Sequence, residues 1–237
     1  MESPEAGLVI WDVDGTLIPA DLRWLRRAIA RTYGLDEAEV SFPHKKVHGY
    51  TDESIAVDAA IASGVSAAEA ERRVPQFGEA LVEVLTEGRG ELRQVQSPYE
   101  GAVQSIADLQ RQGFVQTVLT GNLRRAAEIK LETLGLASRL DLEIGGFGSD
   151  DRDRLKLPGV VARRFVEAYG QPLVSHRTVV IGDAPNDIAC ARHAGFWVAV
   201  VTHRASREEL SKHDPDVILD GLQPELLTSA VKSLMER

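Results

Sequence analysis

The chain has 237 residues, 43% of them hydrophobic, so it can bury a substantial core as one large domain or two small ones. Its net charge of −9, without a cluster of Lys and Arg among aromatic residues, argues against nucleic-acid binding. The single cysteine, Cys190, excludes an intramolecular disulfide and any multi-cysteine metal site. No apolar run is long enough to span a membrane, and residues 1–7 lack the features of a secretion signal, so we expect a cytoplasmic protein.

The first predicted strand ends in two carboxylates. The apolar run Leu8 to Trp11 leads into Asp12, Val13, Asp14 and Gly15. Side chains alternate along a strand, so Asp12 and Asp14 point the same way from one edge of the sheet. Two like charges this close repel each other, and a divalent cation with oxygen ligands relieves the repulsion. The alternative is an ordinary polar turn, because Asp and Gly also form turns without any ligand.

Residues 19–96 have the periodicity of helices, with apolar residues at spacings of three or four. Ser66 and Glu69 form a candidate capping box that opens a helix running to about Leu85. After residue 96, helices alternate with short apolar strands, which is typical of a parallel sheet with helices on both faces. These strands are predicted at residues 114–119, 140–144, 178–181, 197–201 and 217–219. We therefore expect an α/β core of residues 1–18 and 97–237, interrupted by a helical insert of residues 19–96.

A second strand ends in Thr120, Gly121 and Asn122. We expect Asn122 to cap the helix that begins at Leu123. The N–H groups at a helix N-terminus favour an anion such as phosphate, and Gly121 leaves room for its close approach. An ordinary strand-to-helix turn is the alternative.

A third strand, Val179 to Ile181, leads into Gly182, Asp183 and, four residues further on, Asp187. Asp187 falls in the first turn of the next predicted helix, where a negative charge is favourable for capping alone. Asp183 has no such structural explanation. Open parallel sheets bind ligands beyond the carboxyl ends of their strands, so three polar strand ends predict a site there.

These motifs resemble, in order, those of the haloacid dehalogenase-like hydrolase superfamily. Asp12 to Thr16 is similar to its first motif, Thr120 to Asn122 to its second, and Gly182 to Asp187 to its fourth. The resemblance covers essentially the whole chain, and it implies a Rossmann-like core with residues 19–96 as a small helical cap. Within the superfamily the chain most resembles the phosphoglycolate phosphatase and β-phosphoglucomutase branch.

The third motif departs from that branch, which usually has a Lys-Pro pair before the penultimate core helix. This chain has instead a loop of mixed charge, residues 148–158, that contains Arg154 and Lys156. Spacing to the following helix favours Arg154 as the cation that faces the phosphoryl group, whereas chemical type favours Lys156. The choice matters because Arg can bridge two oxygens, whereas Lys acts as a point charge.

The resemblance implies a phosphatase that acts on a small-molecule phosphate ester. Asp12 would be the nucleophile that forms an aspartyl-phosphate, and Asp14 the acid and base. Mg²⁺ would be held by Asp12, the main-chain carbonyl of Asp14 and Asp183, with Asp187 behind them. The transferring phosphoryl group would be bound by residues of the first three motifs: Gly15, Thr16, Thr120, Gly121, Asn122 and either Arg154 or Lys156.

The insert is expected to close over this site and select the substrate. In its segment 44–52 we hypothesise that Lys45, Lys46 or His48 contacts the organic part of the substrate; the alternative is a polar surface loop. Two other functions are considered. One is a phosphomutase of the β-phosphoglucomutase type, and the other a non-catalytic binding protein, which we would expect to lack Asp12, Asp14 or Asp183.

Overall fold

The computed structural model describes residues 7–43 and 50–237. Lys45, Lys46 and His48, proposed above to contact the substrate, lie outside the described residues. No helix within the described ranges combines the length and apolar character needed to cross a membrane.

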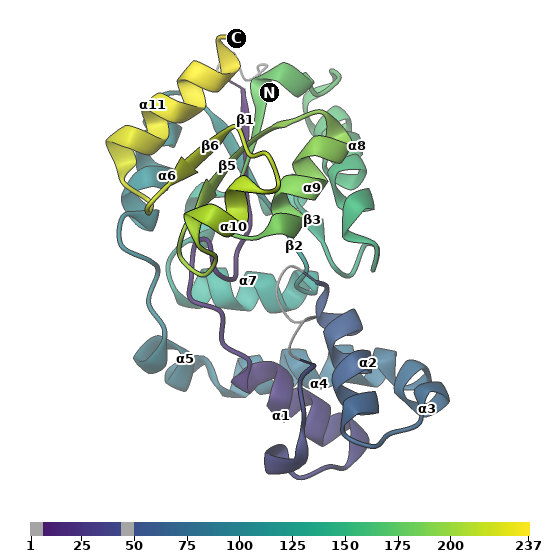
Figure 1. The fold of residues 1–237 in the computed structure, drawn as a ribbon. Helices are drawn as coiled ribbons and strands as arrows, with labels where there is room; N and C mark the ends of the chain where they lie inside the picture. The colour runs from purple at the N-terminus through teal and green to yellow at the C-terminus, as the bar shows by residue number, and fades with distance from the viewer. Residues whose placement is uncertain (1–6, 44–49) are drawn as a thin grey trace.

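A six-stranded parallel sheet forms the centre of the molecule, in the order β3-β2-β1-β4-β5-β6 (Figure 1). The central strand β1 pairs with β2 and β4, and Trp11 lies level with Val118 and Ile181. The strands are β1 (Leu8–Trp11), β2 (Val115–Thr120), β3 (Gly146–Phe147), β4 (Thr178–Gly182), β5 (Trp197–Val201) and β6 (Val217–Leu219). The predicted α/β fold with a parallel sheet is confirmed.

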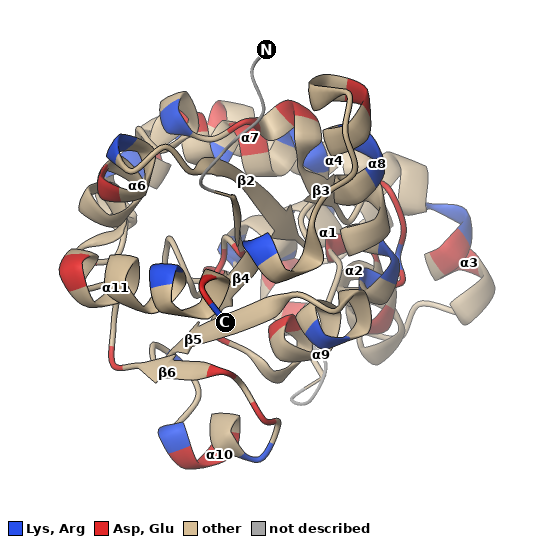
Figure 2. Cartoon of the chain, turned by 90° about the horizontal axis from the view of Figure 1, so that it is seen from above, with Lys and Arg blue, Asp and Glu red and all other residues tan. Residues whose placement is uncertain are grey.

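Helices cover both faces of the sheet, with α6 (Ala102–Arg111) and α11 (Pro224–Met235) on one side and α8 (Leu157–Tyr169) and α9 (Pro185–Ala194) on the other (Figure 2). The side chains of β1 alternate between these layers. Val9 and Trp11 pack with α6 and α11, whereas Leu8 and Ile10 pack with α8 and α9. Burial on both faces explains why β1, β4 and β5 are almost continuously apolar. The short helix α10 (Arg207–Ser211) lies between β5 and β6 in the chain.

The strand predicted at residues 140–144 is wrong. Leu142–Ile144 form a 3₁₀ turn, and the edge strand β3 begins only at Gly146. The Asp141 side chain accepts a hydrogen bond from the main-chain N–H of Glu143, which favours the turn over an extended chain. Apolar residues alone therefore did not distinguish a buried turn from a strand.

The helices of residues 19–96 are α1 (Arg23–Tyr33), α2 (Asp52–Ala62), α3 (Ala67–Arg72), α4 (Val74–Glu87) and α5 (Arg89–Val95). Ser66 caps α3 as predicted, accepting a hydrogen bond from the N–H of Glu69. The single helix expected from Ser66 to Leu85 is instead two helices. Pro75 lies in the first turn of α4, where it needs no N–H partner, whereas inside one continuous helix it would break the hydrogen-bonding pattern.

These helices have a core of their own, built around Trp24, Ile29, Phe77 and Leu85, below the sheet in Figure 1. Helix α7 (Arg124–Thr133) takes part in both cores. Its Ala126 and Ile129 pack with α1 and α4, while Ala127 and Leu131 pack with the sheet. Helix α7 thus connects the insert to the strand ends.

Candidate active site

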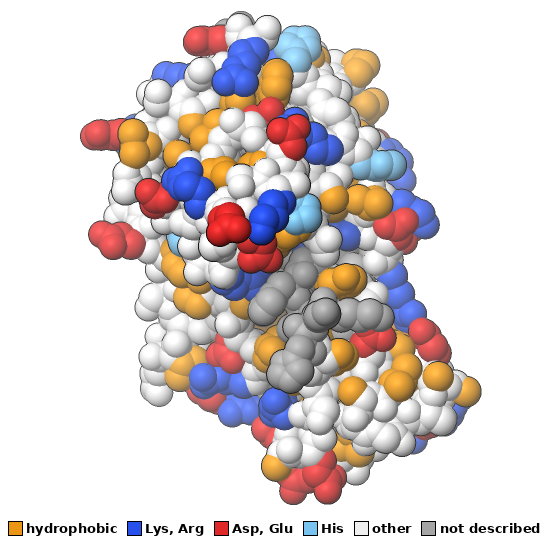
Figure 3. All heavy atoms as spheres, in the orientation of Figure 1, with side chains coloured by type: hydrophobic (Ala, Val, Ile, Leu, Met, Phe, Trp, Pro, Cys, Tyr) orange, Lys and Arg blue, Asp and Glu red, His pale blue; other side chains and the backbone are white. Residues whose placement is uncertain are grey.

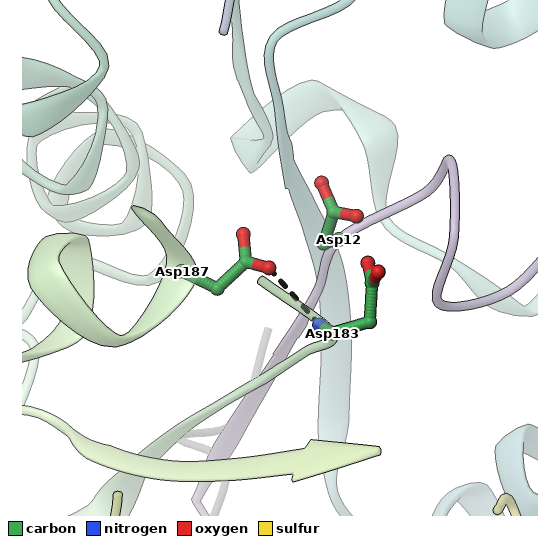
Figure 4. A group of neighbouring side chains, drawn as sticks. All are labelled: Asp12, Asp183 and Asp187. Carbon is green, nitrogen blue, oxygen red and sulfur yellow. Dashed lines mark hydrogen bonds between the residues drawn. The ribbon is translucent and has the colours of Figure 1, made fainter. Parts of the chain in front are cut away.

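Three buried carboxylates meet where β1 and β4 end (Figure 4). Asp12 directly follows β1, Asp183 directly follows β4, and Asp187 comes from the first turn of α9. One carboxylate oxygen from each lies within 4.8 Å of the others. The N–H of Asp12 donates to the carbonyl of Ile181, so the pairing of β1 with β4 continues into the cluster. Carboxylate oxygens are hard donors of the kind that Mg²⁺ prefers.

The turn after Asp14 brings Thr16 between the two strand ends. Thr16 is fully buried, and its hydroxyl lies 3.3 Å from Asp12 Oδ2 and 3.1 Å from Asp183 Oδ1. Gly15 has a φ of 104°, and a side chain there would collide with the guanidinium group of Arg204. The left-handed conformation requires glycine.

Asp187 caps its helix and also faces the cluster. The N–H groups of Asp183 and Ala184 both donate to Asp187 Oδ2 at 3.0 Å, which is the capping role considered from the sequence. The other oxygen, Oδ1, accepts a hydrogen bond from Arg154 at 2.5 Å. A Cβ at Gly182 would lie 2.4 Å from this side chain, so glycine is needed for Asp187 to reach the strand end.

Of the two cations left open by the sequence, Arg154 lies in the cluster and Lys156 does not. Nη2 of Arg154 lies 2.7 Å from Asp12 Oδ1 and also donates a hydrogen bond to Asp187 Oδ1. Its side chain is 9% exposed, whereas that of Lys156 is 61% exposed and pairs with Asp151. One turn of 3₁₀ helix, Arg154–Lys156, directs the two side chains to different surroundings.

The buried carboxylates hold protons more tightly than exposed ones. Burial and the negative charge of Asp187 raise the pKa of Asp12 to about 6. Burial also raises the pKa of Asp183 and of Asp187. A bound divalent cation would oppose these shifts by favouring the ionised carboxylates.

Sequence reasoning missed Arg204, which follows β5. Its Nε lies 2.6 Å from Asp183 Oδ2, and its Nη2 lies 3.2 Å from Oδ1. The neighbouring His203 contacts the carbonyl of Gly15 through Nδ1 and stacks on Tyr99. No motif marks this loop, since only the parallel pairing of β4 with β5 brings it beside Asp183.

The prediction that Asn122 caps the following helix is wrong. Leu123 is the N-cap residue of α7, and its N–H donates to the Asp52 carboxylate at 2.9 Å. Asp52, at the start of α2, supplies the capping oxygen from another part of the chain, which the local sequence does not reveal. The Asn122 side chain instead donates to Asp52 at 3.1 Å and accepts a hydrogen bond from Lys130 at 3.2 Å.

Thr120 and Gly121 lie beside this contact. The Thr120 hydroxyl accepts a hydrogen bond from the N–H of Asn122. A Cβ at Gly121 would lie 2.0 Å from the carbonyl oxygen of Tyr50, while the Gly121 carbonyl accepts the N–H of Asp52 at 2.8 Å. In this structure, glycine at position 121 therefore allows the chain before α2 to approach β2.

A cavity of about 50 Å³ lies at the strand ends. The core contributes Asp12, Asp14 and Thr120 to its lining, and the insert contributes Leu22 and Ile55. The buried Lys130 of α7 also lines it, although sequence reasoning missed this residue. The sequence did contain a signal for Lys130. It lies four residues after Ala126 and three after Ala127, which places it on the same buried face of α7 as these alanines.

Comparison with known proteins identifies the family. The family model of the haloacid dehalogenase-like hydrolases matches residues 9–192 of this chain. The pyrophosphatase PpaX of Halalkalibacterium halodurans is 25% identical over 94% of this chain and 96% of its own length. A phosphoglycolate phosphatase of Rhodospirillum rubrum is 29% identical over 86% of this chain and 82% of its own length.

Solved structures have the same fold. A predicted phosphatase from Clostridium acetobutylicum matches with a TM-score of 0.66 and 18% identity, covering 98% of this chain and 99% of its own. A structure from Thermotoga maritima, described as that of a putative β-phosphoglucomutase, matches with a TM-score of 0.60 and 17% identity. The match covers 94% of this chain and 99% of that one. The ordered motifs, the parallel sheet and the family match agree: the chain belongs to the haloacid dehalogenase-like hydrolases.

Proposed function

We propose that this protein is a Mg²⁺-dependent phosphatase that hydrolyses a small phosphorylated metabolite through an aspartyl-phosphate on Asp12. The observation that carries the proposal is the contact between Asp12, Asp187 and Arg154 beside Asp183, at the end of the central strands. The names of the phosphoglycolate phosphatase and pyrophosphatase relatives support the reaction class. A location in the cytoplasm stays a prediction from the sequence.

Asp12 attacks the phosphorus atom and the ester oxygen leaves, taking a proton from Asp14. Asp14 then removes a proton from a water molecule, whose oxygen attacks the aspartyl-phosphate and releases phosphate. The Thr16 hydroxyl orients Asp12 in both steps, as it lies 3.3 Å from Oδ2. Arg154 lies close enough to Asp12 to stabilise negative charge on the phosphoryl oxygens, and Thr120, Gly121 and Asn122 line the same cavity.

Asp12, the main-chain carbonyl of Asp14 and Asp183 would hold Mg²⁺. The donor set fits the ion, because carboxylate oxygens of Asp12 and Asp183 are buried close to one another at the strand ends and are the hard donors that Mg²⁺ prefers. When bound, Mg²⁺ neutralises charge on the transferring phosphoryl group. Asp187 supports the site through the N–H of Asp183 rather than as a ligand.

Residues 19–96 act in this proposal as a cap on the core of residues 1–18 and 97–237. Leu22, Leu25 and Ile55 of this segment line the same cavity as Asp12. Apolar residues on that side limit the access of bulk water to the cavity and leave room for a small organic group. Acidic and basic side chains are interspersed over the visible face of the molecule, so the charge that binds an anionic ester is local to the cavity (Figure 3).

The direct test is phosphate release from a panel of small phosphate esters, with Mg²⁺ and with a chelator. Asp12→Asn, purified in the same way, controls for contaminating phosphatases. Release by the native chain alone, dependent on Mg²⁺, supports the proposal and ranks the substrates. If no ester is hydrolysed, the proposal is wrong. The next assay would then test for phosphomutase activity, with sugar phosphates and their corresponding bisphosphates as primers.

Mg²⁺ is expected to raise the melting temperature of the protein, since the ion binds the folded state and not the unfolded chain. At a concentration one hundred times the Kd the shift should be roughly 5–10 °C. Differential scanning calorimetry measures it, with NaCl of equal ionic strength as the control. Asp183→Asn should abolish the shift, and an unchanged shift in this variant would remove Asp183 from the proposed ligands.

Arg204→Met is expected to strengthen Mg²⁺ binding by about tenfold or more. Arg204 donates to both oxygens of Asp183, and the ion must displace at least one of these charge-assisted hydrogen bonds, which are worth about 1.5–3 kcal/mol each. Isothermal titration calorimetry with Mg²⁺ checks this. Arg207→Met, an exposed arginine that pairs with Asp220, is the matched control. Weaker binding in Arg204→Met would mean that Arg204 supports the metal site.

A further inference from the structure

Lys130 of helix α7 is a buried lysine in contact with Asp14. Its Nζ lies 2.6 Å from Asp14 Oδ2, and its side chain is only 9% exposed. Burying an ammonium group is costly unless it is paired and hydrogen-bonded. A lysine on the solvent side of α7 would avoid that cost, so its place on the buried face calls for a role at the strand ends.

Further polar groups hold the ammonium in place. Asn122 Oδ1 accepts a hydrogen bond from Nζ at 3.2 Å, and the Asn122 amide in turn donates to Asp52 Oδ1 at 3.1 Å. Asp52 is itself anchored by the N–H of Leu123. Lys130 therefore has a fixed position between two carboxylates, those of Asp14 and Asp52.

The two carboxylate oxygens of Asp14 have different surroundings. Oδ2 is held by Lys130, whereas Oδ1 is buried and has no hydrogen-bond partner among residues 7–43 and 50–237. An unpartnered buried oxygen is costly, and Asp14 lines the cavity together with Asp12. The arrangement leaves Oδ1 available for a group that enters the cavity.

We propose that Lys130 is a positioning residue for Asp14. It holds Oδ2, so that Oδ1 gives its proton to the leaving ester oxygen and later takes a proton from the attacking water. Lys130 itself keeps its three protons throughout, and the bond that breaks in the first step is the one between phosphorus and the ester oxygen. The inference rests on the proposed phosphatase function and assigns a role to a residue outside the four motifs.

A purely structural role for Lys130 leads to a different result. If Lys130 only stabilised the fold, all esters would lose activity equally. A positioning role instead predicts a selective loss for esters whose leaving group needs the proton.

The test compares two substrates on Lys130→Met: an alkyl phosphate from the panel, whose leaving oxygen must be protonated, and p-nitrophenyl phosphate, whose leaving group departs without a proton. We expect kcat/KM for the alkyl ester to fall on the order of 10- to 100-fold and that for the aryl ester less than about threefold. The parameter kcat/KM reports the steps up to departure of the leaving group. The ratio of the two values is independent of the fraction of protein that is folded.

Asp14→Asn supplies the reference. If Lys130 acts through Asp14, Lys130→Met should leave the ratio of the two kcat/KM values unchanged in the Asp14→Asn background. Lys212→Met, an exposed lysine paired with Glu208, is the matched control and should behave as the native chain. Lys130→Gln replaces Lys130→Met if the latter does not fold.

A selective loss for the alkyl ester that disappears in the Asp14→Asn background supports the inference. Equal losses for both esters, a loss selective for the aryl ester, or a selective loss that persists without the Asp14 carboxyl would each overturn it. If the native chain hydrolyses neither ester nor any other in the panel, the proposed function itself is wrong and this inference with it. Failure of the inference alone is recognised by full activity of the native chain.

Discussion

Asp12→Asn is expected to lower kcat for phosphate release on the order of 10⁴-fold or more, because an amide cannot attack phosphorus. The substitution keeps the shape of the side chain and its contact with the Thr16 hydroxyl. It also removes a buried negative charge that lies next to Asp187, whose own negative charge raises the pKa of Asp12. Arg154 keeps its ion pair with Asp187, so the fold should stay close to native in stability, and thermal unfolding shows whether any loss of activity reflects unfolding.

Phosphate release and thermal unfolding on the same preparation check this prediction. Acid quenching of the native chain during turnover, followed by mass spectrometry, should find a phosphoryl group on Asp12. Asp108→Asn, a partly buried surface aspartate paired with Arg111 and distant from the strand ends in the sequence, is the control and should retain full activity. Activity in Asp12→Asn above about one percent of native would argue against Asp12 as the nucleophile.

Arg154→Met is expected to destabilise the protein by about 3–5 kcal/mol, the usual cost of removing one partner of a buried ion pair. Arg154 is the hydrogen-bonding cation of both Asp12 and Asp187, at 2.7 and 2.5 Å. Its loss leaves two buried carboxylates facing each other. Activity should fall by at least about 10²-fold, since charge on the phosphoryl oxygens also loses its counterpart.

Urea unfolding of the native chain, Arg154→Met and the double variant Arg154→Met with Asp187→Asn measures the stability effect. The double variant should regain part of the lost stability, because one of the two unpaired charges is gone. Lys156→Met should have a negligible effect on stability, since Lys156 is exposed and pairs only at the surface with Asp151. Native-like stability of Arg154→Met would mean that the carboxylates find another cation.

Residues 44–49 and the division into core and cap stay predictions from the sequence. Lys45, Lys46 and His48 have the chemistry to bind an anionic or hydroxylated group. If they contact the substrate, replacing all three should change the ranking of the esters in the panel. The insert itself is consistent with its predicted helical character in the described residues.

The sequence by itself determined the sheet, its strand ends and the carboxylates they position. Runs such as Leu8 to Trp11 and Val179 to Ile181 form parallel strands because they are apolar on both faces. Asp12 directly follows β1 and Asp183 directly follows β4, so both carboxylates lie at the same edge of the sheet. Only the tertiary structure decided the partners of these carboxylates. Arg204, Lys130 and Asp52 reach the site from a loop, a helix face and the insert, and Arg154 differs from Lys156 only in the direction that one 3₁₀ turn gives it. Local periodicity records whether a residue is buried, whereas the choice of ion-pair partner depends on which elements the packed sheet brings together.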